Sequence, residues 1–129
     1  MSGTFIGQVL LVGAGGFIGS ALRFIVSSWA QRSALIAGFP LGTLVVNVIG
    51  CLLIGVLSGL AEQRQLLEPG QRLFLSVGIL GGFTTFSTFA FETVSLLQEA
   101  DVARAIINVL LQVTLGCIAA LLGFISVAR

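Results

Sequence analysis

Long stretches without a charged side chain constrain this chain more than any other feature. Four of them are present, covering Met1–Leu22, Ser33–Ala61, Leu73–Phe91 and Ala105–Ala128. A helix that crosses a lipid bilayer needs roughly 20 apolar residues, and all four runs are long enough, the third only barely. The sequence therefore predicts an all-α membrane protein with a single transmembrane domain over residues 1–129.

The expected helices follow these runs. We place them near residues 5–29, 40–61, 71–97 and 101–127, joined by short connections. Pro40 suits the first turn of the second helix, and Pro69-Gly70 is a turn signal between the second helix and the third. The amino terminus lacks the basic segment of a secretory signal peptide, so we expect the first run to remain in the protein.

Composition excludes several other classes of protein. Hydrophobic residues make up 57% of the chain and charged residues 9%, against about 25% charged in a soluble domain. A net charge of +1 does not supply the basic stripe that nucleic acid requires, so no nucleic-acid partner is expected. There is no His, and Cys51 and Cys117 lie in apolar runs, where we interpret them as packing residues. No enzyme is expected, because this residue set offers no nucleophile with a neighbouring base.

The arginines do not select one orientation in the membrane. With four spans, one side holds three arginines and the other two or three: Arg64, Arg72 and Arg129 against Arg32, Arg104 and, if the first helix ends early, Arg23. Orientation follows the Lys/Arg bias of short loops. A chain this balanced is expected to insert both ways round and to form an antiparallel, dual-topology homodimer. The alternative is a weakly biased chain with one fixed orientation.

The third run contains the least helical segment. Gly81-Gly82 is followed by Thr84-Thr85, a poor helix sequence, and we predict a break near 81–85. Non-helical backbone at membrane depth is tolerated only inside protein or beside a water-filled cavity. Freed carbonyls there can coordinate a cation, and a new helix N-terminus favours an anion. A kink relieved by neighbouring hydroxyl groups is the alternative.

Aromatic and hydroxyl side chains alternate along this part of the chain. Every third residue is Phe, with hydroxyls between: Phe83, Phe86 and Phe89, with Thr84, Thr85, Ser87 and Thr88. An aromatic stripe at this spacing is usually core packing. Beside a break, however, positive ring edges and hydroxyl donors form a lane that can replace an anion's water. Without a fixed positive charge, such a lane would hold the ion weakly enough to conduct it.

Polar residues elsewhere could join this lane. Asn47, alone in the second run, could donate hydrogen bonds to an anion or link two helices. Arg23 could form an anion-attracting mouth or be an interfacial side chain. Glu92 could be a vestibule carboxylate or an interfacial anchor. Asn108 and Gln112 are spaced to share one face of the fourth helix.

Small residues four apart predict where helices approach closely. Gly15 and Gly19 form such a pair in the first run, and Gly55 and Gly59 form one in the second. Helices in membranes pack through pairs of this kind, because the backbones can come into contact.

Three stretches together resemble a known family. They are GSALR (19–23), GTLVVNVIG (42–50) and above all GGFTTFSTFAFE (81–92). The chain resembles the Fluc (CrcB) family of bacterial fluoride channels over nearly its full length. The resemblance implies small four-helix subunits that pair antiparallel, with two fluoride pathways per dimer. It also implies passive export of toxic fluoride across the bacterial inner (plasma) membrane.

The same resemblance implies roles for individual residues. The fluoride pathway would comprise Asn47, Phe86 and Phe89, hydroxyl candidates Thr85, Ser87 and Thr88, and the matching arginine and glutamate, Arg23 and Glu92. Gly81 and Thr84 would supply backbone carbonyls to a structural sodium ion, Na+, at the dimer interface. Three positions depart from the family's usual residues, namely Phe83, Asn108 and Gln112. The contribution of the fourth helix therefore stays open.

Two other functions compete with a channel. A small dual-topology multidrug/proton antiporter also has four short helices, but it needs a carboxylate in the middle of the first helix. No acidic residue precedes Glu62. A non-transporting membrane assembly subunit would have no need for a broken helix with a polar lane.

Overall fold

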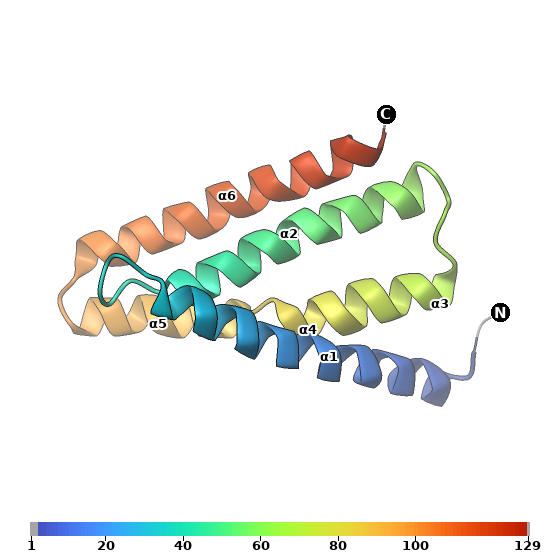
Figure 1. Cartoon of the computed structure of the whole chain (residues 1–129), viewed down its shortest axis with the longest axis horizontal. Helices are drawn as coiled ribbons and strands as arrows, with labels where there is room; N and C mark the ends of the chain where they lie inside the picture. The colour runs from blue at the N-terminus through green and yellow to red at the C-terminus, as the bar shows by residue number, and fades with distance from the viewer. Residues whose placement is uncertain (1–2, 129) are drawn as a thin grey trace.

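The computed structural model describes residues 3–128 as helices joined by short connections (Figure 1). The elements are α1 (Phe5–Arg32), α2 (Leu41–Glu62), α3 (Pro69–Arg72), the π-helical segment η1 (Leu73–Leu80), α4 (Gly81–Phe83), α5 (Phe86–Gln98) and α6 (Val102–Ala128). Four stretches are long and apolar enough to cross a membrane: Phe5–Arg32, Leu41–Glu62, Pro69–Gln98 and Val102–Ala128. The prediction of four long apolar helices is thereby confirmed.

Side chains form hydrogen bonds at both ends of α1. Thr4 caps α1, because its Oγ1 accepts a hydrogen bond from the Gly7 backbone N–H at 3.2 Å. Gln31, in the last turn of α1, joins this helix to the start of α2. Its Nε2 donates to the Phe39 carbonyl at 2.9 Å, and its Oε1 accepts from the Gly42 N–H at 3.0 Å. The first helix therefore continues to Arg32, three residues beyond the expected end at 29.

The third long stretch is helical up to Phe83 and again from Phe86. Between them, Thr84 (φ −87°, ψ 160°) and Thr85 (φ −151°, ψ 121°) are extended. The interruption lies within the expected range near 81–85 but is limited to its last two residues, since Gly81 and Gly82 lie in α4. A Cβ atom on Gly82 would stand 2.6 Å from the Gly16 carbonyl oxygen. Glycine is therefore needed at position 82 for the close contact between α4 and α1, and it does not interrupt the helix.

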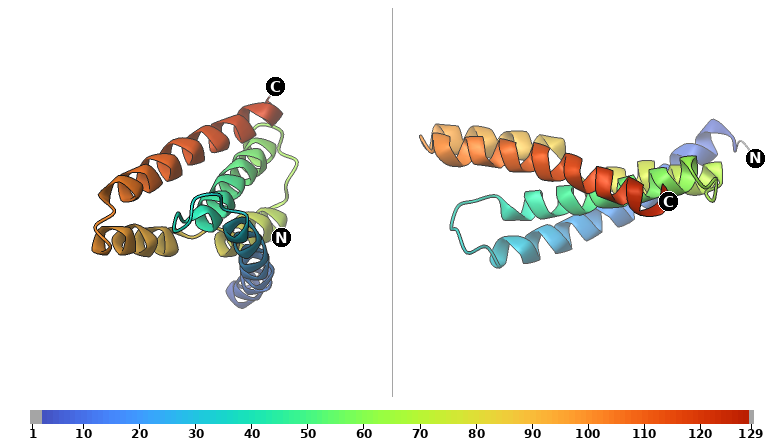
Figure 2. Two further views of the ribbon diagram at one scale, coloured as in Figure 1. Left: turned by 60° about the vertical axis from the view of Figure 1, so that its left-hand side comes forward. Right: turned by 90° about the horizontal axis from the view of Figure 1, so that it is seen from above.

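The helices pack in two pairs, which are joined by contacts between α1 and α2. Figures 1 and 2 show α2 lying along α6, and α1 lying along η1 and α4. The start of α1, the α2–α3 connection and the end of α6 lie at one end of the molecule. The α1–α2 and α5–α6 connections lie at the other. Each long helix thus runs the full length of the molecule, as expected for four successive spans.

Glycines allow the close approach within each pair. A Cβ on Gly15 would stand 2.7 Å from the Phe74 carbonyl oxygen, and one on Gly19 would overlap the Ile79 carbonyl. Likewise, a Cβ on Gly55 would overlap the carbonyl of Ala120 in α6. The prediction that Gly15, Gly19 and Gly55 are packing residues is confirmed.

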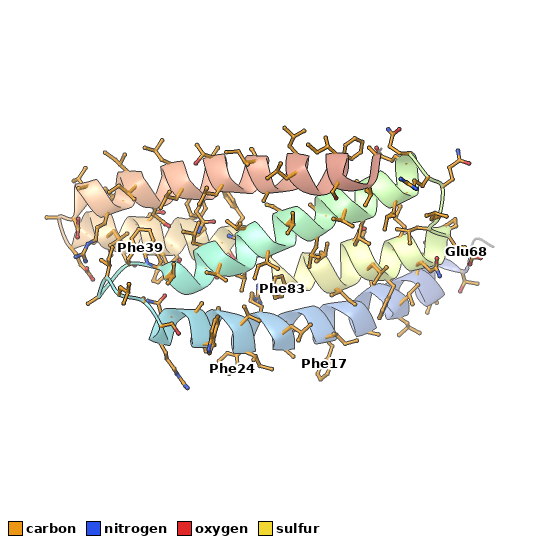
Figure 3. All side chains as sticks on the ribbon, turned by 45° about the horizontal axis from the view of Figure 1, so that its top comes forward. Phe17, Phe24, Phe39, Glu68 and Phe83 are labelled. Carbon is orange, nitrogen blue, oxygen red and sulfur yellow. The ribbon has the colours of Figure 1, made fainter. Side chains whose placement is uncertain are left out.

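Most large apolar side chains face outward. Phe17 and Phe24 are 77% and 74% exposed and point away from the other helices, whereas Phe83 is 6% exposed and lies inside (Figure 3). The same outward apolar character holds for α6, where Leu121 is 60% exposed. A surface of this kind suits lipid tails and not water.

Candidate functional site

Asn47, on α2, holds the extended residue Thr85 in place. Its side-chain Oδ1 accepts from the Thr85 N–H at 2.9 Å, and its Nδ2 donates to the Thr85 carbonyl at 3.0 Å. Backbone polar groups at membrane depth have no water to bond with, so each must find a partner within the protein. The Asn47 amide thus forms hydrogen bonds with both backbone groups of Thr85, as a neighbouring β-strand would. It therefore compensates for the helical bonds lost at this position.

Gln112, on α6, extends this polar contact to a third helix. Its Oε1 accepts a hydrogen bond from Asn47 Nδ2 at 3.0 Å. Its Nε2 is buried and has no hydrogen-bond partner among the residues that the structure describes. An amide nitrogen carries two donors, so both hydrogens of Asn47 Nδ2 are engaged while those of Gln112 Nε2 are not.

A hollow of about 380 Å³ lies beside these groups. It is lined by residues of α2, η1, α4, α5 and α6 and by the two extended threonines: Asn47, Gly50, Cys51, Ile54, Ser76, Leu80, Gly81, Thr84, Thr85, Phe86, Phe89, Gln112 and Val113. The rings of Phe86 and Phe89 meet edge to face, with centroids 5.5 Å apart and planes at 65°. Ring edges carry partial positive charge. The hollow thus combines amide, hydroxyl and aromatic groups with no ionised side chain in its lining.

The interruption also removes the helical hydrogen bonds to the Gly81 and Thr84 carbonyls. A continuous helix would direct the Thr85 N–H at the Gly81 carbonyl, but this N–H donates to Asn47. Similarly, the Thr88 N–H would bond the Thr84 carbonyl, but it donates to Thr85 Oγ1 at 3.2 Å. The Thr84 carbonyl accepts from Arg23 Nη1 at 3.4 Å, a long contact for a charge-assisted bond. Oxygen atoms suited to a hard cation are thereby made available.

The three hydroxyl candidates cluster at the start of α5. Thr85 Oγ1 lies 3.0 Å from Thr88 Oγ1 and 3.4 Å from Ser87 Oγ. Because Thr85 Oγ1 also accepts from the Thr88 N–H, it caps the helix. The positive end of the α5 dipole coincides with these hydroxyls, which is a favourable place for an anion.

Glu92 lies beside a second hollow of about 390 Å³, towards the α1–α2 end of the molecule. This hollow is lined by Ser27, Ser28, Gln31, Arg32, Gly42, Thr43, Thr88 and Glu92. Glu92 Oε1 accepts from Thr43 Oγ1 at 2.7 Å. Its Oε2 is buried without a hydrogen-bond partner in the described part of the chain. Thr85 in the lining of the first hollow and Thr88 in the lining of the second have their hydroxyl oxygens 3.0 Å apart.

Comparison with known proteins places the chain in a family. The family model described as CrcB-like protein, Camphor Resistance (CrcB), matches residues 10–124. The chain belongs to the CrcB family. Its relatives include a protein of Parabacteroides distasonis, 49% identical over 118 residues, covering 92% of this chain and 91% of the relative. Another is from Methylobacillus flagellatus, 46% identical over 117 residues, with 91% of each chain covered.

A third relative, from Methanosarcina acetivorans, is 42% identical over 118 residues, covering 92% of this chain and 88% of the relative. The first two relatives are named fluoride-specific ion channel FluC, and the third fluoride-specific ion channel FluC 1. Together with the four long apolar helices, these CrcB relatives establish a multi-pass membrane protein. The resemblance stated from the sequence is confirmed.

The structure brings most of the predicted site residues together and separates a few. Asn47, Thr85, Phe86 and Phe89 line the first hollow, and Thr88 and Glu92 line the second. Ser87 and Arg23 line neither of these two hollows. Arg23 lies inside α1, directed at the Thr84 carbonyl.

Sequence reasoning missed the roles of Thr43 and Gln112. Thr43 stands four residues before Asn47, and thus on the same helix face, which was the available signal for its contact with Glu92. Gln112 was noted as polar but had no assigned partner. The buried Asn108, its neighbour on α6, donates instead to Thr93 Oγ1 at 3.1 Å. These two α6 amides therefore serve different contacts.

Proposed function

We propose that this chain forms a fluoride-selective channel, which lets toxic fluoride leave the cell passively down its own gradient. The observation that carries the proposal is the first hollow, which is lined by the edge-to-face pair Phe86–Phe89 and by two side-chain amides beside an interrupted helix. The names of the CrcB relatives support fluoride as the ion. The proposed location is the inner (plasma) membrane of a bacterial cell.

The chemistry of the hollow suits a small, strongly hydrated anion. Amide and hydroxyl hydrogens and aromatic ring edges can each take the place of a hydrating water. The lining contains no Arg, so no full positive charge would hold the ion. Conduction requires binding that is favourable enough for access yet weak enough for release, and a lining of neutral donors meets both conditions.

The proposed pathway runs along α5. Phe86, Phe89 and Thr85 would contact the ion in the first hollow, and Thr88 and Glu92 would flank it in the second. Arg23 would contribute positive potential from α1. Ser87 would act through its contact with Thr85, 3.4 Å away, and not from the wall of either hollow.

The functional unit in this proposal is an antiparallel homodimer with two pathways. In one chain, Phe86 is 78% exposed although it lines the first hollow, so the wall of this hollow is incomplete. A second copy would cover it. The nearly equal numbers of arginines that the sequence puts on the two sides of the four spans support a copy inserted in the opposite direction.

A structural sodium ion at the dimer interface is part of the same proposal. The carbonyls of Gly81 and Thr84, which the interruption releases, are hard oxygen ligands of the kind that such an ion requires. When bound, the ion would offset the partial negative charges of these carbonyl oxygens where two copies meet. Replacing sodium by choline at equal ionic strength should then lower the dimer's unfolding temperature, with potassium as a control for charge alone.

The channel proposal is tested by fluoride efflux from liposomes that contain the purified protein. Fluoride efflux should be fast, and chloride efflux slow, for the unmodified chain. Phe86→Ile should reduce fluoride efflux by at least about tenfold, because it removes a ring edge from the pathway. Phe17→Ile is the matched control, since Phe17 is equally exposed but lies on the outside of α1. Fluoride retained by the unmodified dimer would overturn the proposal.

A further inference from the structure

We propose that Arg32 attracts anions into the second hollow, where it offsets the charge of Glu92, and that it thereby sets the rate at which fluoride enters at low ionic strength. The inference rests on the proposed function and adds the residue that governs entry. It follows from the contacts of the arginines and from the lining of the second hollow.

Arg32 differs from the other arginines of the described chain in its contacts. It is exposed, and it forms no hydrogen bond or ion pair with any residue from 3 to 128. The others each contact an oxygen atom: Arg23 the Thr84 carbonyl, Arg64 the Val127 carbonyl, Arg72 the Glu62 carboxylate, and Arg104 the Asp101 carboxylate and the Ala37 carbonyl. The charge of Arg32 is therefore available to act on a mobile ion.

The second hollow holds one carboxylate and one guanidinium group. Glu92 and Arg32 are the only ionisable residues in its lining, and the other lining residues are neutral. Thr43 donates to Glu92 Oε1 at 2.7 Å, but Glu92 Oε2 is buried without a hydrogen-bond partner within the described residues. A carboxylate compensated by a single hydroxyl repels an approaching anion. Arg32 supplies the opposite charge in the same hollow, so an anion can still enter.

The position of Arg32 suits an entrance. It is the last residue of α1, next to the α1–α2 connection at one end of the molecule (Figure 1). Thr88 belongs to the same hollow, and its hydroxyl oxygen lies 3.0 Å from that of Thr85, which lines the first hollow. An anion attracted by Arg32 would therefore arrive beside the hydroxyls that adjoin the proposed pathway.

An exposed, unpaired arginine at an entrance acts through its electric field and not through tight binding. Such a field raises the local concentration of anions, and its effect on the rate of entry falls steeply as salt screens the charge. The screening length is about 30 Å at 0.01 M salt and about 3 Å at 1 M. Loss of Arg32 should therefore matter at low ionic strength only, whereas a packing defect would persist at every ionic strength.

The test is the fluoride current through single reconstituted dimers in planar bilayers, at fluoride concentrations well below saturation. Sodium gluconate, whose anion is large, sets the ionic strength. Arg32→Gln should lower the current about 3- to 10-fold at about 10 mM ionic strength, near the lower limit of electrostatic steering. At about 1 M the difference should shrink to less than about 1.5-fold. Arg32→Lys keeps the charge and should keep the current of the unmodified chain at both ionic strengths.

Two further variants show whether the charge must lie in the hollow. Arg104→Gln is the matched control, because it removes the same charge from the same end of the molecule but from a residue outside this lining. It should change the current at low ionic strength by less than about 1.5-fold, since Arg104 is paired with Asp101. Arg32→Gln combined with Ser28→Arg returns the charge to the lining one helical turn earlier and should restore most of the current.

Three results would overturn the inference while the channel proposal stands. If Arg32→Gln keeps its current at low ionic strength, Arg32 contacts only solvent or a lipid phosphate. An equal loss at all ionic strengths would mean that Arg32 has a packing role. A loss of the same size in Arg104→Gln would assign the effect to the net charge of this end. If the unmodified chain carries no fluoride current, the channel proposal itself fails and the inference fails with it.

Discussion

At the scale of single residues, Asn108 shows how a buried amide can be structural. It is fully buried, at 0% exposure, and its Nδ2 donates to Thr93 Oγ1 at 3.1 Å. Thr93 Oγ1 in turn donates to the Phe89 carbonyl at 2.8 Å. The pair thus joins α6 to α5 one turn after Phe89 and does not itself line either hollow.

Removing one member of this pair should cost more than removing both. Thr93→Val leaves the Asn108 amide buried without its acceptor, which should destabilise the protein by about 1–3 kcal/mol. Thr93→Val combined with Asn108→Leu replaces both partners by apolar groups and should recover most of that loss. The unfolding temperature in detergent measures both. A double variant less stable than Thr93→Val alone would show that Asn108 has another essential contact.

The sequence marked some residues of the candidate site but not their partners. Asn47 and the phenylalanines at 86 and 89 were predictable because a lone amide and a regular aromatic spacing are unusual within an apolar run. The contacts Asn47–Gln112 and Thr43–Glu92 were not, because they depend on how α2 turns relative to α6 and α5. A single sequence shows which face of each helix is polar, but it does not show which face of a neighbouring helix packs against it. The assignments of pathway and sodium residues stay predictions.

At the scale of helices, two glycines of α1 allow the effect of packing on stability to be measured apart from the effect of helix propensity. A Cβ on Gly19 would overlap the Ile79 carbonyl, whereas one on Gly13 would meet nothing within 4 Å. Gly19→Ala should therefore push α1 away from η1 and cost about 1–3 kcal/mol. Gly13→Ala should be neutral or stabilise by about 0.5–1 kcal/mol, since alanine is the better helix former. Unfolding temperatures of the two variants check this, and equal losses would contradict it.

Thr85 tests whether a capping hydroxyl stabilises the restart of the helix at α5. Thr85→Ala removes the oxygen that accepts from the Thr88 N–H at 3.2 Å, which should cost about 1 kcal/mol. Thr85→Ser keeps that oxygen and should retain stability close to that of the unmodified chain. Hydrogen exchange at the first turn of α5 gives the local measurement. Unchanged protection in Thr85→Ala would show that the Asn47 contacts alone maintain the restart.

Helix positions were more predictable than the interruption within the third stretch. The second helix was expected at 40–61 and lies at Leu41–Glu62, because charged residues mark the ends of apolar runs. The glycine pair was expected to interrupt its helix, but Gly82 is required for contact with Gly16 and stays helical. The extended residues are the threonines that follow. The hydrogen bonds from Asn47 explain why the threonines are extended. Helix propensity cannot predict a contact with another helix.

At the scale of the whole molecule, the distribution of charge leaves the direction of insertion undetermined. α1 extends to Arg32, so Arg23 lies within the helix and does not count as a loop charge. By sequence, the comparison is then three arginines on one side of the four spans, namely Arg64, Arg72 and Arg129, against Arg32 and Arg104 on the other. Short-loop Lys and Arg residues set orientation. A difference of one is small enough for both orientations to coexist, as an antiparallel dimer requires.

Added arginines should force each copy into one orientation. Gln63→Arg with Gln65→Arg gives five arginines against two, whereas Ser33→Arg, Leu35→Arg and Ile36→Arg together give three against five. All five substitutions fall at exposed positions in the connections, so they should not disturb packing. Either variant expressed alone would supply copies of one orientation only. Its fluoride efflux from cells should fall by more than about tenfold, since antiparallel partners would be scarce.

Expressing the two variants together should restore efflux towards that of the unmodified chain, because each supplies the orientation that the other lacks. Cysteine labelling from outside the cell, with reporter cysteines in the α2–α3 connection, should confirm that each variant alone is oriented one way. Full efflux from one variant with a single verified orientation would mean that parallel copies, or one copy alone, conduct. In that case the open side of the hollow at Phe86 would have to be covered by lipid.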